Sequence, residues 1–145
     1  MRSFKVALVM ENRSIEIHDS VLEDLHVLNS VAILDFSSVY IHQSAGRPGV
    51  DAGSGWVQKA RLQIRDAIIE GSFSDFPCEI LGGHITLGEA VLNNEIRIPL
   101  GYAGKTELRL ESWNGAFLRI TGGGVELELI GEPKYVEEFR PNPSN

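Results

Sequence analysis

Residues 107–130 read ELRLESWNGAFLRITGGGVELELI, and this stretch decides the fold class. Apolar residues alternate with polar ones through most of it, a period of two that is typical of β-strands with one buried and one solvated face. Asn114-Gly115 marks one turn, and Gly122-Gly123 is expected to form a two-residue hairpin turn. The stretch therefore predicts successive antiparallel strands. The residues expected to face inward are Leu108, Leu110, Leu118, Ile120, Val125, Leu127 and Leu129.

The turn near Asn114 allows two registers for the strands that it joins. A loop of residues 114–116 pairs Glu111 with Arg119, which is a favourable cross-strand ion pair. A loop of residues 113–115 places glycine at its third position, which three-residue loops prefer, but sets Arg109 against Arg119. Because like charges repel, we predict the first register.

The same alternation recurs along most of the chain, with glycine and asparagine turn signals between the strands. This pattern, without long helical stretches, predicts one all-β domain over residues 1–139, built as an antiparallel β-sandwich or flattened β-barrel. Residues 140–145 are expected to form a flexible tail. The alternating segments before the C-terminal stretch are 4–10, 15–17, 39–41, 62–64, 85–87 and 96–100.

One segment, DSVLEDLHVLNSV at residues 19–31, departs from the period of two. Val21, Leu22, Leu25 and Leu28 have helical spacing, and Ser20 with Glu23 fits a capping box. One short helix near 21–28 is therefore an alternative to a strand there.

Composition excludes several classes of function. The 145 residues include 13 Lys and Arg against 20 Asp and Glu, a formal net charge of -7. Nucleic acids and anionic membrane surfaces both need a concentrated basic face, so we expect neither as a partner. The only cysteine, Cys78, permits no intrachain disulfide and fits a reducing compartment. With no signal-peptide pattern in residues 1–14 and no membrane-spanning run, we expect a cytoplasmic protein.

The tail pattern GEPKYVEEF at 131–139, preceded by VELELI at 125–130, carries a resemblance. From EIRIPL at 95–100 onward, roughly the C-terminal third of the chain resembles a small uncharacterised bacterial all-β protein family with no assigned function. The resemblance implies an all-β pattern. It implies no activity, cofactor or site residue.

No catalytic or metal motif stands out. No two histidines have a metal-ligand spacing, and no Gly-x-Ser-x-Gly elbow occurs. Cys78 is expected to be buried as a small hydrophobic residue. We therefore predict no metal and no cofactor. If the protein were an enzyme, Asp66, His42 and His84 would be the residues to test first. The four histidines are His18, His26, His42 and His84.

The glycine-rich stretch SAGRPGVDAGSGW, residues 44–56, is not a phosphate loop, because it lacks Gly-Lys-Ser/Thr and no helix follows it. We expect a long connection between two strands. Connections of this length are functional or disordered. Basic residues on neighbouring strands and outward aromatic rings add further candidates. The candidate ligand or partner contacts are Arg47, Asp51, Trp56, Arg61, Arg65, Tyr102, Trp113 and Phe117.

These observations predict a non-enzymatic cytoplasmic binding module that self-associates or neutralises a partner protein. The alternative is a β-barrel or sandwich that binds a small ligand or carbohydrate with the rings of Trp56, Tyr102 and Trp113. The third hypothesis is an enzyme of unknown reaction. The sequence alone names no partner or ligand.

Overall fold

The structure is a computed structural model that describes residues 11–141. Its described residues form nine strands and no helix, which confirms the predicted all-β fold class. The strand expected at 4–10 and most of the expected tail lie outside the described residues. The strands are β1 (Asn12–Leu28), β2 (Val31–Ser44), β3 (Gly53–Arg65), β4 (Ile68–Gly71), β5 (Cys78–Leu87), β6 (Ala90–Asn93), β7 (Glu95–Ile98), β8 (Gly101–Ser112) and β9 (Phe117–Phe139).

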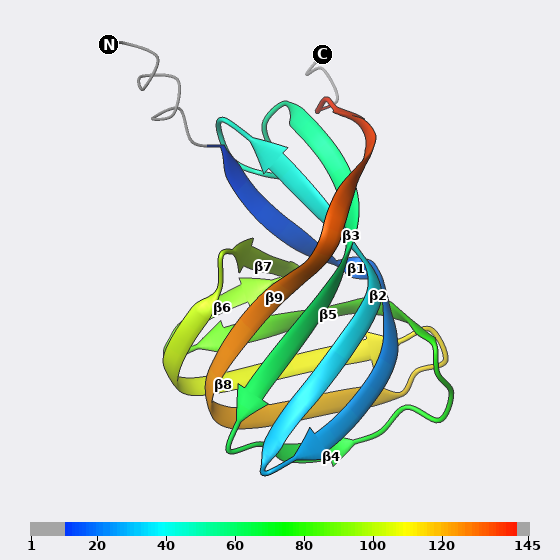
Figure 1. Cartoon of the computed structure of the whole chain (residues 1–145), viewed down its shortest axis with the longest axis vertical. Helices are drawn as coiled ribbons and strands as arrows, with labels where there is room; N and C mark the ends of the chain where they lie inside the picture. The colour runs from blue at the N-terminus through cyan, green and yellow to red at the C-terminus, as the bar shows by residue number, and fades with distance from the viewer. Residues whose placement is uncertain (1–10, 142–145) are drawn as a thin grey trace.

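Six of the strands close into a ring of antiparallel hydrogen-bonded pairs, a flattened barrel (Figure 1). Its order is β1-β2-β3-β9-β8-β5, and β5 returns to β1 through Val21 and Leu22. Three short strands flank the ring: β6 pairs with β5, β7 with β1 and β4 with β9. No helix within residues 11–141 is long and apolar enough to span a membrane.

Four long strands continue beyond the ring into a second layer of the molecule (Figure 1). There β7, β1, β2, β3 and β9 lie side by side in that order. We call this region the upper sheet. It comprises residues 12–16, 40–44, 53–57, 95–98 and 134–139.

The interior of the ring is a packed apolar core. A cavity among these core side chains has a volume of about 10 Å³, which is too small for a ligand. The largest fully buried side chains are Ile17, Leu22, Leu34, Ile41, Leu62, Ile64, Ile80, Ile85, Leu108, Leu110, Leu118 and Ile120.

The segment 21–28 is part of β1, so the alternative of a helix there is wrong. The pairing of β1 with β2 shifts register three times between Glu16 and Asp24, and Asp19 has a positive φ of 70°. Each irregularity disturbs the alternation of buried and exposed side chains. The apparent helical spacing of Val21, Leu22 and Leu25 therefore comes from bulges in a strand.

The expected hairpin at Gly122-Gly123 is also wrong, because β9 runs through it without turning. These glycines allow β9 to lie close to β3. A Cβ on Gly122 would collide with the backbone oxygen of Arg65 and with Ile64, and a Cβ on Gly124 would collide with the Arg65 side chain. Glycine in a strand often marks such a point of close packing. The glycine run lets β9 leave its pairing with β8 and pair with β3.

At the tip of the β8–β9 hairpin, the preferred register is wrong and the competing one is observed. Arg109 lies opposite Arg119, and Gly115 takes a φ of 85° that favours glycine. The two guanidinium groups are separated by their own partners. Arg109 lies 4.5 Å from the centre of the Phe117 ring, and Arg119 Nε donates to Glu107 Oε2 at 3.0 Å. These contacts remove the repulsion that argued against this register.

Substituting Gly122→Ala tests the role of the glycine run. The added methyl group has no room against Arg65 and Ile64, so we expect a loss of about 1–3 kcal/mol in the free energy of unfolding. Gly101→Ala is the matched control, because no heavy atom lies within 4 Å of its added Cβ. Chemical denaturation of both variants measures the difference. Equal stability of the two would show that β9 does not need the close approach.

Leu110→Ala tests the assignment of the core face. Leu110 is 1% exposed, and its truncation should cost about 2–5 kcal/mol in the free energy of unfolding. Leu81→Ala provides the comparison, because Leu81 is 40% exposed. A loss below about 0.5 kcal/mol for Leu110→Ala would place this side chain outside the core.

Candidate functional site

The glycine-rich stretch forms a structured loop over the upper sheet. The connection is shorter than expected, because β2 runs to Ser44 and β3 begins at Gly53. The Asp51 carboxylate accepts a hydrogen bond from the backbone N–H of Arg47 at 2.7 Å, and the Arg47 carbonyl accepts from the N–H of Asp51 at 2.8 Å. Asn12 Nδ2 on β1 donates to the Gly46 carbonyl at 2.7 Å. These bonds fix the position of Arg47.

A polar face of the upper sheet lies beneath this loop. The register places Ser14 on β1 between His42 on β2 and Arg97 on β7, and Glu16 on β1 has Glu95 as its β7 partner. Paired residues share a face of the sheet. These side chains therefore form one polar surface. The loop covers it at Gly49, where a Cβ would lie 3.5 Å from the His42 ring.

His42 is the most buried ionisable residue of this face, at 9% exposed. Its Nε2 lies 2.8 Å from Glu16 Oε1, and because a carboxylate only accepts, Nε2 carries the hydrogen. The ring packs edge-on against Tyr40 at 4.8 Å and Phe139 at 5.0 Å. Its Nδ1 is buried and has no hydrogen-bond partner among the described residues. The imidazole is thus held by one charged partner and two rings.

Glycines on β3 make room for these rings. A Cβ on Gly55 would collide with the Tyr40 phenol, so glycine there lets Tyr40 reach across β3 to β9. The phenol donates to Glu137 Oε2 at 2.7 Å. Burial, and next the Glu137 carboxylate, raise the pKa of Tyr40 above its ordinary value. The glycines of the 44–56 stretch therefore support packing across three strands.

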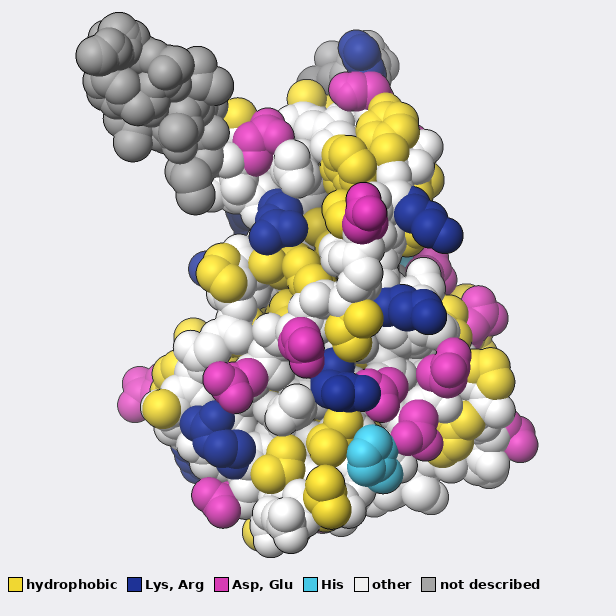
Figure 2. All heavy atoms as spheres, viewed as in Figure 1, with side chains coloured by type: hydrophobic (Ala, Val, Ile, Leu, Met, Phe, Trp, Pro, Cys, Tyr) yellow, Lys and Arg dark blue, Asp and Glu magenta, His cyan; other side chains and the backbone are white. Residues whose placement is uncertain are grey.

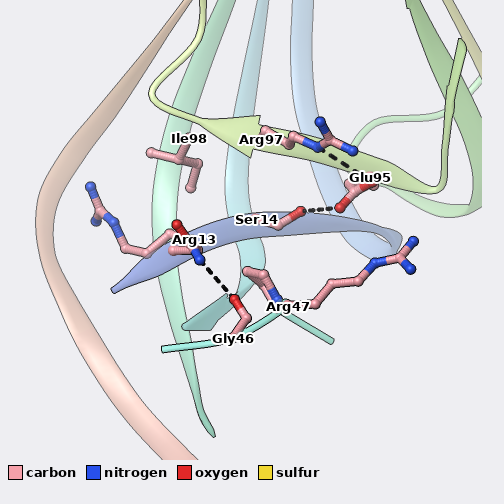
Figure 3. Close-up of a pocket in the computed structure, with 9 residues that line it drawn as sticks. Arg13, Ser14, Gly46, Arg47, Glu95, Arg97 and Ile98 are labelled. Carbon is pink, nitrogen blue, oxygen red and sulfur yellow. Dashed lines mark hydrogen bonds and ion pairs between the residues drawn. The ribbon is translucent and has the colours of Figure 1, made fainter. Parts of the chain in front are cut away.

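A pocket of about 410 Å³ opens between this loop, β1 and β7 (Figure 3). We call it the arginine pocket. In Figure 3, Arg97 lies above β1, Arg47 extends toward the right beyond the end of β1, and Arg13 extends toward the left. Between the first two, Ser14 Oγ donates to Glu95 Oε1 at 3.3 Å. The lining residues are Asn12, Arg13, Ser14, Gly46, Arg47, Pro48, Glu95, Arg97 and Ile98.

The charges of the arginine pocket are only partly balanced. Glu95 lies 3.9 Å from Arg97 Nε, at the limit of an ion pair. Within residues 11–141, neither Arg13 nor Arg47 forms a salt bridge. A smaller hollow of about 210 Å³ shares Arg47 and extends to His42. A guanidinium group is a planar donor that fits carboxylate or phosphate, so this site can hold an acidic group.

The site lacks the geometry of nucleophilic catalysis. The Ser14 hydroxyl donates to Glu95, and the His42 N–H donates to Glu16, so neither activates the other. The residues named for an enzyme also lie apart. His42 is paired with Gly55, whereas Asp66 follows the other end of β3, roughly 35 Å away along the strand. His84 lies on β5, where its Nε2 is 3.8 Å from Glu107.

Cys78 is half-buried against the core, and burial raises the pKa of its thiol above the ordinary value. A raised thiol pKa means less thiolate at neutral pH, and the thiolate is the nucleophile. Cys78 is therefore placed as a packing residue.

The structure spreads the other predicted contact residues over the molecule. Trp56 packs on Tyr135 with ring centres 5.3 Å apart, and Phe117 lies beneath Arg109. Tyr102 and Trp113 lie at opposite ends of β8, so these rings do not form one platform with Trp56. Arg61 donates to Asp35 at 2.7 Å, and Arg65 lies 3.9 Å from Glu126. Of the predicted set, Arg47 lines the arginine pocket, and Asp51 holds its loop.

A cluster of potential metal ligands lies on the β1–β2 hairpin. Ligand atoms of Asp24, His26 and Asp35 fall within 4.8 Å of one another. His26 Nδ1 already lies 2.9 Å from Asp24, and Arg61 donates to Asp35. With these partners, the three side chains form part of a surface network that contains a hydrogen bond and an ion pair.

No protein-family model, curated protein or solved structure matches this chain. The resemblance of the C-terminal third to an uncharacterised bacterial family stays a prediction.

The Tyr40–Glu137 hydrogen bond predicts a tyrosine that ionises late. Ionisation would place a phenolate against a carboxylate in a partly buried site, so the Tyr40 pKa lies above its ordinary value. Ultraviolet titration of the native protein and of Tyr40→Phe isolates this group. Glu137→Gln should lower the Tyr40 pKa toward the ordinary range. Ionisation of Tyr40 in that range in the unsubstituted protein would contradict the contact.

Proposed function

We propose that the protein is a non-enzymatic binding module that holds an acidic side chain of a partner protein in the arginine pocket. The observation that carries this proposal is Arg47. Its backbone is fixed over the polar face by Asp51, while its guanidinium group makes no ion pair within residues 11–141. Arg97 lines the same pocket, and its guanidinium group lies toward the same end of β1 in Figure 3. Two guanidinium groups so placed offer forked hydrogen bonds to a carboxylate.

The net charge favours a protein partner over a nucleic acid. At -7, the whole molecule repels an extended polyanion. Salt screens charges beyond about 8 Å at physiological ionic strength, so one carboxylate in contact with Arg47 is little affected by distant acidic residues. An acidic segment that presents single carboxylates therefore suits the pocket better than a phosphate backbone.

The other hypotheses have weaker support. A ligand inside the barrel has no space, and the three aromatic rings named for a carbohydrate site lie apart. Self-association by strand addition at β9 is disfavoured by two features of its upper edge. Pro133 removes a backbone donor there, and Val136 is a bulge between the paired residues Tyr135 and Glu137. Both features are typical ways to protect an edge strand.

Fluorescence anisotropy with a short labelled peptide of alternating glutamate and glycine tests this function. We expect saturable binding that weakens at high salt, and at least about a tenfold loss of affinity in the double variant Arg47→Gln with Arg97→Gln. Arg65→Gln is the matched control, because Arg65 lies on the barrel outside the pocket. Equal binding of the matching glutamine peptide, or unchanged affinity in the double variant, would refute the proposal.

A further inference from the structure

A second hollow, of about 350 Å³, lies where the barrel passes into the upper sheet. We call it the waist pocket. It is formed by β2, β3 and β9, whereas the arginine pocket is formed by β1, β7 and the loop after β2. The two pockets are therefore lined by different strands. The residues lining the waist pocket are Ser37, Ser38, Val57, Gln58, Lys59, Ile130, Gly131, Glu132 and Lys134.

The waist pocket exists because both hydrogen-bond ladders of β3 break at the same place. The register with β2 shifts between Phe36 and Val39, and the register with β9 shifts between Val57 and Lys59. Bulges redirect side chains and leave strand groups unpaired. Gly131 on β9, with a φ of 75°, lies in the second break.

Gln58 is the buried polar group of this pocket, at 8% exposed. Its Nε2 donates to the Gly131 carbonyl at 2.6 Å. Because a carbonyl only accepts, this contact fixes which end of the amide is nitrogen. Its Oε1 is buried and has no hydrogen-bond partner among the described residues. Buried polar atoms are nearly always paired, and the register break around Gln58 leaves this one as an exception.

The rim of the pocket is cationic and polar. Lys134 is the partner of Val57, and Lys59 is two residues further along β3, so both lysines lie on the outer face. Within residues 11–141, neither forms a salt bridge, and the side chains of Ser37 and Ser38 form no hydrogen bond. The pocket thus offers two ammonium groups and two hydroxyl groups for an anion.

We infer that the waist pocket binds a small hydroxylated anion, a sugar phosphate or a sugar acid. The anionic group lies between Lys59 and Lys134, and a ligand hydroxyl donates to the hydroxyl of Ser37 or Ser38. Glu132 is a second acceptor for such hydroxyls. The volume is in the range of small-molecule sites. This inference does not depend on the arginine pocket.

Isothermal titration calorimetry of the full chain tests the site with ribose 5-phosphate, gluconate, inorganic phosphate and ribose. We expect saturable binding of at least one of the first two, and weaker binding of phosphate and ribose. The double variant Lys59→Gln with Lys134→Gln should bind at least about tenfold more weakly. Both side chains are exposed, so the fold should persist, which circular dichroism checks. The matched control is the double variant Arg47→Gln with Arg97→Gln, which should bind as the unsubstituted protein does.

A second readout follows the side-chain amide of Gln58 by nuclear magnetic resonance. The ligand that binds should shift this amide signal, because the amide bonds the Gly131 carbonyl and both residues line the pocket. Inorganic phosphate binding as tightly as ribose 5-phosphate would overturn the hydroxylated ligand. No binding of either hydroxylated anion at millimolar concentration, or equal binding by the lysine variant, would overturn the site.

Discussion

The structure depends on four strands that each take part in both the barrel and the upper sheet. β1, β2, β3 and β9 close the barrel and also form most of the upper sheet, so their ladders must change register where the layers meet. The shifts occur within β1–β2, β2–β3 and β3–β9. A filled barrel leaves no interior site, whereas shifted strands leave hollows outside. The waist pocket follows from this shared use of strands.

Glycine has a consistent role across the molecule. Gly55 admits the Tyr40 ring, and Gly122 admits the backbone of β3 beside β9. In both places a side chain would separate elements that must touch. The glycine-rich stretches that suggest a ligand loop and a hairpin in the sequence are therefore explained mainly by packing. Gly115, at the β8–β9 tip, serves the turn that its sequence context predicts.

Features of the fold that depend on local alternation of apolar and polar residues can be predicted from the sequence. Features that depend on pairing between distant strands cannot. The period of two identifies Leu62, Ile64, Leu108 and Leu110 as core, and all four are buried. It fails at 21–28, where bulges break the period. The arginine pocket needs β1 beside β7, and the Ser14–Glu95 bond joins residues 81 apart in the chain. Nothing in the local pattern of either segment specifies this pairing, so only the loop half of the pocket, with Arg47, could be predicted.

On this acidic protein, some lysine and arginine side chains form ion pairs and others do not. Acidic and basic side chains intermingle over the barrel surface (Figure 2). There Arg119 bonds Glu107 and Glu70, and its guanidinium group holds the pKa of Glu107 below the ordinary value. Several other described Lys and Arg side chains form no salt bridge within residues 11–141, Lys105 and Arg140 among them. Arg47 and the two lysines of the waist pocket differ from these two because they also line hollows. At these three positions unpaired positive charge lies on concave surface, which is the combination that recognition of an anion requires.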